Sequence, residues 1–197
     1  MRIGRIVLMA AACCWLGSVT CVHAGMINGD FESGDFSGWT QVGDTSYTDV
    51  VSGVCPDFDT VCTPHSGSFA AYFGNPFPGG VTQTITTVPG TRYNLGFWLI
   101  IGAHQAEDRR GEYTVAWDST ILSDHVDPAS APWAYESYDV VATGTSSVVS
   151  FQFNSISDNY GLDDVTVAAA TPEPISMILV GSALIALACG RRLFKRG

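Results

Sequence analysis

The chain lacks positive charge over most of its length. Of its nine Lys and Arg residues, only Arg92, Arg109 and Arg110 lie between residues 25 and 170, and this stretch has no lysine. The same stretch holds eighteen of the nineteen acidic residues. Nucleic acid and anionic lipid both require cationic side chains as partners. The composition therefore excludes both for this region and favours divalent cations, neutral sugars or simple solubility.

Recognisable catalytic motifs are also missing. The sequence has no Gly-x-Ser-x-Gly, no His-Glu-x-x-His and no phosphate-binding glycine loop. Glu107, Asp108 and Glu112 form one acidic group that has the residue types for glycoside cleavage, which needs an acid and a base. A solvated turn with neighbouring arginines is the alternative interpretation. The sequence predicts a protein that is not an enzyme. A polysaccharide hydrolase is the less favoured hypothesis.

The N-terminus has the three parts of a secretory signal peptide. Arg2 and Arg5 precede an apolar stretch over residues 6–16, and Ala24 is a small residue suited to cleavage before Gly25. Cys21 leaves lipidation as a minor alternative. Residues 1–24 are therefore predicted to be removed on export.

The C-terminus combines a Pro-Glu-Pro triplet, an apolar run and a basic tail. Pro172, Glu173 and Pro174 precede residues 175–189, which carry no charge, and the cations that follow are Arg191, Arg192, Lys195 and Arg196. A helix over the apolar run would be about 22 Å long, a minimal membrane span. The basic tail would remain in the cytoplasm and the main domain outside.

This C-terminal arrangement over residues 171–197 resembles the PEP-CTERM sorting signal of Gram-negative bacteria. The resemblance implies recognition by an exosortase-type protease, transient anchoring in the inner membrane, and a final place at the cell surface or in the extracellular matrix. An ordinary membrane anchor is the alternative.

Export also bears on Cys55 and Cys62, the two cysteines between residues 25 and 170. In an oxidising compartment they are expected to form a loop disulfide.

Residues 25–170 show the pattern of an all-β domain. Short runs rich in Val, Thr, Tyr and Phe recur between clusters of turn residues, and no helical periodicity is evident. Loops are expected at residues 75–80 and 124–132. The pattern predicts a two-sheet jelly-roll sandwich with strands at residues 47–51, 69–73, 81–87, 92–101, 112–117, 137–142, 147–154 and 162–168.

Several short motifs resemble the galactose-binding-like jelly rolls found in many carbohydrate-binding modules. They are the opening Asn-Gly-Asp-Phe-Glu of residues 28–32 with Trp39, the His-Ser-Gly-Ser of residues 65–68, and the closing Tyr-Gly-Leu-Asp-Asp-Val of residues 160–165. The resemblance implies a structural calcium held by the side chains of Glu32 and of Asp163 or Asp164, with backbone oxygens near Asn28, Ser66 or Gly67. Solvated carboxylates, or carboxylates bound to turn N–H groups, are the alternative.

Strand alternation locates the candidate residues on the two faces of the sheets. It places Asp163 on the same side as Val165 and Val167, and Asp164 on the opposite side. It also directs Trp98 and Asn94 outward, where an exposed indole would serve as a platform for a sugar. A loop that covers Trp98 is the alternative.

The prediction is an exported, non-catalytic matrix or surface protein that binds exopolysaccharide. The second hypothesis is a purely structural, calcium-stabilised matrix component without a sugar site.

Overall fold

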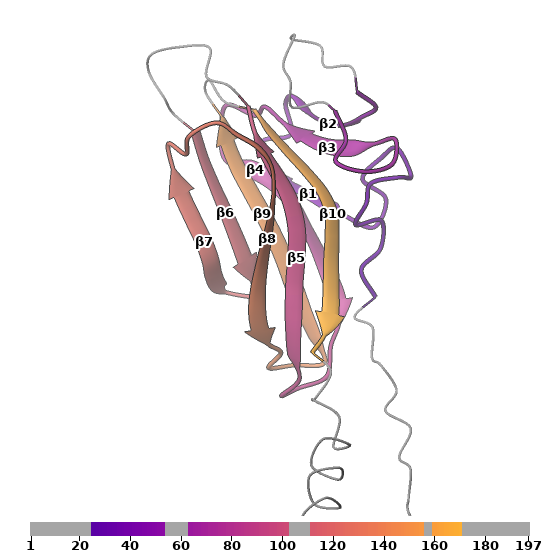
Figure 1. The fold of residues 1–197 in the computed structure, drawn as a ribbon. Helices are drawn as coiled ribbons and strands as arrows, with labels where there is room; N and C mark the ends of the chain where they lie inside the picture. The colour runs from indigo at the N-terminus through magenta and orange to yellow at the C-terminus, as the bar shows by residue number, and fades with distance from the viewer. Residues whose placement is uncertain (1–24, 54–62, 103–110, 156–158, 171–197) are drawn as a thin grey trace, which may run out of the picture.

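The described residues of the computed structural model, 25–53, 63–102, 111–155 and 159–170, form ten β-strands in two layers (Figure 1). Sheet I has the order β1-β4-β9-β6-β7 and sheet II the order β2-β3-β10-β5-β8. The predicted all-β two-sheet jelly-roll sandwich is confirmed. The strands are β1 (Thr40–Gly43), β2 (Thr48–Val51), β3 (Ala70–Phe73), β4 (Gly79–Thr86), β5 (Arg92–Ile101), β6 (Gly111–Trp117), β7 (Thr120–Val126), β8 (Ala131–Val141), β9 (Ser146–Ser155) and β10 (Tyr160–Ala169).

The core lies between the sheets and follows the predicted alternation. Tyr93, Leu95, Phe97 and Leu99 of β5 are each at most 2% exposed. The two sheets are joined by aromatic contacts such as that of Phe73 with Phe153, whose ring centroids are 4.3 Å apart. The same inward alternation holds in β6 and β9, at Tyr113, Val115, Trp117, Val149, Phe151 and Phe153.

The edges of the sheets differ from the sequence prediction. β1 and β7 were not predicted, β4 begins at Gly79 inside a predicted loop, and β7 and β8 extend into the predicted loop at residues 124–132. β7 and β8 each pair with one neighbour only. An edge strand can expose most of its side chains and can contain a proline such as Pro132, so its sequence does not show the pattern of a half-buried strand.

The segment before β1 packs against the last strand. The N–H of Val165 donates to the carbonyl of Gly29 at 2.8 Å. A Cβ at Gly29 would lie 2.0 Å from the carbonyl oxygen of Val165, so only glycine fits there. Phe31 and Trp39 stack with centroids 5.6 Å apart and anchor the segment in the core. This segment, rather than the first strand, brings Glu32 toward β10.

Several predicted features lie outside the described residues. They are the signal peptide, the sorting signal with Pro172, Glu173, Pro174, Arg191 and Arg192, and the disulfide of Cys55 and Cys62. Within the four described ranges, the structure has no helix that is long and apolar enough to cross a membrane.

Candidate functional site

A bulge in β10 determines how the two closing aspartates are presented. Asp163 pairs with Trp98 and Thr166 with Gly96, so β10 has one more residue than β5 between these pairs. Asp164 has a φ of 50°, in the left-handed region that few residues other than glycine adopt. The bulge places Asp163 on the outer side with Trp98, while Val165 and Val167 enter the core. The predicted parity of Asp163 is therefore wrong, because alternation assumes an unbroken strand.

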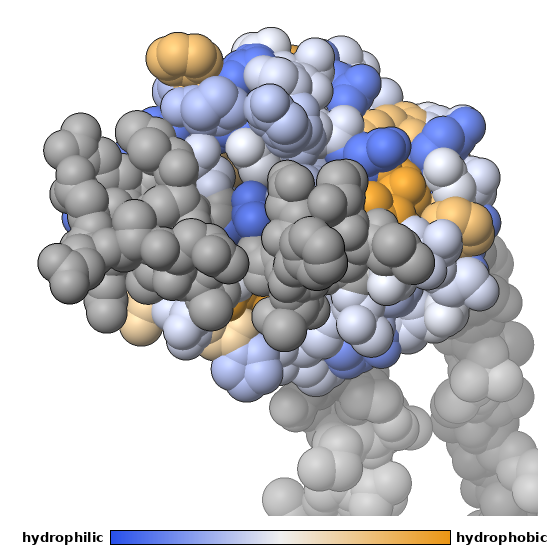
Figure 2. Space-filling model, turned by 90° about the horizontal axis from the view of Figure 1, so that it is seen from above, coloured by the Kyte–Doolittle hydropathy of each residue, from blue (hydrophilic) through white to orange (hydrophobic). Residues whose placement is uncertain are grey.

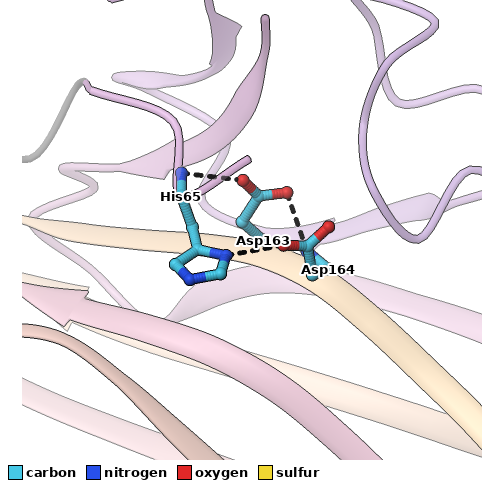
Figure 3. Close-up of side chains that lie close together, drawn as sticks. All are labelled: His65, Asp163 and Asp164. Carbon is cyan, nitrogen blue, oxygen red and sulfur yellow. Dashed lines mark hydrogen bonds and ion pairs between the residues drawn. The ribbon is translucent and has the colours of Figure 1, made fainter. Parts of the chain in front are cut away.

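Asp163 fastens a distant segment to β10. Its side chain is fully buried, and its carboxylate accepts backbone N–H groups from His65 at 2.9 Å, Ser66 at 3.2 Å and Asp164 at 2.7 Å. Figure 3 shows this carboxylate directed at the backbone of His65. Burial raises the pKa of Asp163 to about 6, against the effect of its N–H donors.

Asp164 holds the side chains of the same segment. Its Oδ2 lies 2.6 Å from Nδ1 of His65 (Figure 3). Its Oδ1 accepts the hydroxyl of Ser66 at 2.9 Å. Candidate ligand atoms of His65, Asp163 and Asp164 lie within 4.8 Å of one another. The structure thus brings together the closing aspartates and the His-Ser-Gly-Ser motif, which are about 100 residues apart in the sequence.

Glu32 binds the other end of this segment. Its Oε1 accepts the N–H groups of Ser68 at 2.7 Å and Phe69 at 2.8 Å. Gly67 has a φ of 60°, and a Cβ there would lie 2.3 Å from Oε1 of Glu32. Residues 65–69 therefore run between the carboxylate of Glu32 and those of β10.

Asn28 mainly shapes its own loop. Its side-chain amide donates to the carbonyls of Asp35 at 2.9 Å and Ser37 at 3.1 Å. The backbone carbonyl of Asn28 accepts Nε1–H of Trp39 at 2.9 Å. Asn28 also lines a pocket of about 560 Å³, together with Asp30, Asp164 and residues 165–168 of β10.

The donor set around residues 65–69 suits a hard cation better than a soft one. Calcium takes six to eight oxygen ligands. The oxygen donors here are the carboxylates of Asp163 and Asp164 and the hydroxyl of Ser66, and the imidazole of His65 lies among them. The described residues include one Lys or Arg, Arg92, which pairs with Asp139 on β8 at 3.9 Å and so does not neutralise these carboxylates. A cation would compete with backbone N–H groups at both oxygens of Asp163 and at Oε1 of Glu32. At Asp164 it would compete with the side chains of His65 and Ser66.

Trp98 lies on the outer face of sheet II as predicted, yet it is not an open platform. The ring of His65 stacks on it with centroids 3.7 Å apart and planes at 15°. Trp133 meets His65 edge-on at 5.8 Å and donates its Nε1 to the carbonyl of Thr63 at 2.9 Å. The structure therefore shows the alternative arrangement, in which a loop covers one face of Trp98. Asn94, on the same outer face, donates to Asp139 at 3.1 Å.

Tyr135 is the exposed aromatic residue of this face that the sequence analysis missed. It pairs with Trp98 across β5 and β8, their ring centroids are 5.5 Å apart, and it is 51% exposed. A Cβ at Gly96 would lie 2.2 Å from its hydroxyl, so the end of the ring rests on the sheet where residue 96 has no side chain. A glycine inside a strand of large residues often marks such a close approach, and Gly96 was the available signal.

The hydrophobic surface of the described residues is divided. Seen from above in Figure 2, hydrophobic residues form small separate patches among hydrophilic ones. A broad apolar patch does not appear among the described residues visible in this view.

No family model matches the sequence, and no curated protein matches it. Among solved structures, the chain is similar to TmCBM61 in complex with β-1,4-galactotriose, with a TM-score of 0.56 and 18% identity over 76% of this chain and 100% of that one. It is also similar to the enzymatically active domain of bacteriophage CBA120 tailspike protein 4, with a TM-score of 0.52 and 16% identity over 75% of this chain and 21% of that one. A family 16 carbohydrate-binding module follows, with a TM-score of 0.49 and 15% identity over 72% of this chain and 97% of that one. The chain therefore has a fold that it shares with carbohydrate-binding modules.

Proposed function

We propose that residues 25–170 form a non-catalytic module that binds exopolysaccharide through the outer face of sheet II. The observation that carries this proposal is Tyr135, a half-exposed ring held on the sheet by Gly96 and Trp98. Aromatic rings supply large apolar contact area at low cost in conformational entropy, which suits the C–H face of a sugar. The shortage of basic residues favours a neutral glycan.

Polar side chains continue from the aromatic pair along the same face. Successive outward pairs of β5 and β8 are Trp98 with Tyr135, Gly96 with Ser137, and Asn94 with Asp139. Residues two apart along a strand are about 6.6 Å apart, so a chain of sugar units along β8 would meet an aromatic ring first and then hydroxyl, amide and carboxylate groups. This sequence of groups is suited to a polysaccharide that lies along the strand.

Replacing Tyr135 with alanine is expected to weaken glycan binding tenfold or more, equivalent to about 1.4 kcal/mol. The measurement is calorimetric titration of the purified protein with host exopolysaccharide and a panel of neutral oligosaccharides. Tyr47→Ala is the matched control, because Tyr47 is 68% exposed in the turn before β2, which lies at the opposite edge of sheet II from β8. Equal affinities for wild type and Tyr135→Ala would reject this face as the site. No glycan binding at all would favour the purely structural matrix role.

We also propose that calcium stabilises the junction of Glu32, Asp164 and residues 65–69, with a backbone oxygen near Asn28 as a further donor. The support is that three carboxylates, those of Glu32, Asp163 and Asp164, bind one short segment. The one Lys or Arg among the described residues, Arg92, pairs with Asp139 elsewhere. Calcium here would link the opening segment to the last strand and thereby hold His65 against Trp98.

The proposed route to the cell surface rests on the sequence alone. The Pro-Glu-Pro triplet, the apolar run and the basic tail with Arg191 and Arg192 support sorting by an exosortase-type protease after export. Replacing Glu173 with alanine should leave a larger, unprocessed form in the membrane fraction. A variant that is processed and released like the wild type would contradict the assignment.

A further inference from the structure

A small pocket lies on the outer face of sheet I, on the side of the sandwich opposite to Tyr135. It has a volume of about 220 Å³. Its walls include the cross-strand pairs Glu112 with Asn154 and Thr114 with Gln152, contributed by β6 and β9. These residues alternate with core residues of the same strands, so they face away from the core. Pro78 closes one side.

Two glycines leave this part of the sheet open. Gly79 and Gly80 of β4 pair with Phe153 and Gln152 of β9. Because glycine has no side chain, the neighbouring strand does not cover Gln152.

Phe77, directly before Pro78, is 68% exposed. Its backbone is held by two hydrogen bonds: its N–H donates to Asp44 at 3.2 Å, and its carbonyl accepts Nδ2–H of Asn75 at 2.7 Å. Phe77 therefore presents an exposed aromatic ring directly before Pro78, which lines the pocket.

The side-chain oxygen of Asn154 is buried and has no hydrogen-bond partner. Few buried side-chain nitrogen or oxygen atoms in the described part of the chain lack a partner in this way. A buried acceptor that is left unpaired costs about 1–3 kcal/mol. The groups that a ligand can reach are those of the more exposed lining residues, Glu112, Thr114 and Gln152. Their oxygens are acceptors, so the pocket suits a ligand with hydroxyl or amine donors.

The remaining groups narrow the ligand class. A carboxylate, two carboxamides and a hydroxyl are groups that pair with neighbouring sugar hydroxyls. Glu112 and the acidic character of the domain oppose an anionic sugar. Pockets for drug-sized ligands have volumes of about 300–1,000 Å³. The smaller volume of this pocket fits one sugar unit and not a longer stretch of polysaccharide.

We propose that this pocket, formed by Glu112, Thr114, Gln152 and Asn154, binds a single neutral sugar unit as a second carbohydrate site. This inference rests on the proposed carbohydrate-binding function and extends it to the opposite face. With sites on both faces, one molecule connects two polysaccharide chains, and effective affinity for a matrix exceeds that of either site.

The test is calorimetric titration of the purified protein with neutral monosaccharides, alongside Gln152→Ala, Asn154→Leu and Tyr135→Ala. Gln152 is exposed, so its replacement changes stability little and separates binding from folding. We expect tenfold weaker or lost monosaccharide binding for Gln152→Ala and Asn154→Leu, and unchanged binding for the control Tyr47→Ala, which lies outside both proposed sites. Tyr135→Ala is compared for its effect on polysaccharide binding. Wild type should also form turbid networks with the polysaccharide, and each single-site variant should not.

Two results would overturn the second site. One is the absence of monosaccharide binding in wild type, and the other is binding that both pocket variants retain. Failure of the sheet II proposal is distinguishable, because it would leave Tyr135→Ala like wild type in every assay while the pocket variants still lose binding. Release of soluble sugars from the polysaccharide, abolished by Glu112→Gln, would replace binding by hydrolysis as the role of the pocket.

Discussion

Removal of calcium is expected to lower the melting temperature of the protein by about 5–10 °C. A ligand present at 100 times its dissociation constant stabilises the folded state by about 2.7 kcal/mol. In a domain of this size each kcal/mol corresponds to about 2–4 °C. The effect is expected to be large because Glu32 and Asp164 hold the two ends of residues 65–69, and a cation between them ties the opening segment to β10. Thermal unfolding after exhaustive chelation, and again after calcium is restored, measures it.

A conservative variant separates the metal from the hydrogen bonds. Glu32→Gln keeps a side-chain oxygen for the N–H groups of Ser68 and Phe69 but removes the charge. Its melting temperature should be nearly insensitive to calcium, whereas Asp139→Asn, on the exposed face of β8, should respond like wild type. If wild type unfolds at the same temperature with and without calcium, Glu32 accepts backbone N–H groups and does not bind calcium.

The central strands were predictable because burial on one face imposes alternation. Tyr93, Leu95 and Phe97 of β5 repeat every second residue and are all in the core. β7 carries few buried side chains, so its sequence is close to that of a loop. β1 has four residues and no fully buried one, which leaves too short a pattern to recognise.

The candidate site was predictable only in part. Motif resemblance grouped Glu32, Asp163 and Asp164, and the structure does bring them to one segment. The bulge at Asp164 depends on strand register, which alternation does not report. The stacking of His65 on Trp98 is a contact between a loop and a strand, for which the sequence contains no periodic signal. Tyr135 was missed because its exposure depends on Gly96 in the neighbouring strand.

In metal-free protein, the free energy of unfolding is expected to fall as the pH rises from 4 to 7, with Asp163 as a main cause. Burial raises its pKa from 3.8 to about 6 in the folded state. Between these values the folded state holds more protons than the unfolded state, so stability decreases with pH. The contribution is complete below pH 3.8 and lost once the pH passes about 6. The difference between the two pKa values corresponds to about 3 kcal/mol.

The effects of other carboxyl groups on stability can be separated from that of Asp163. Some lie outside this pH range, and the rest cancel when the wild type is compared with a variant at residue 163. Hydrogen bonds from Ser37 and Ser46 lower the pKa values of Asp35 and Asp44, so their contribution is present above pH 3.8 and lost below it. Repulsion among the many surface carboxylates has the same sign as the effect of Asp163, and Asp163→Asn retains that repulsion. Denaturant unfolding at several pH values should therefore give a steeper decrease for wild type than for Asp163→Asn between pH 4 and 6. Equal slopes would show that the buried Asp163 carboxyl is ionised throughout this range, held so by the N–H groups of His65, Ser66 and Asp164.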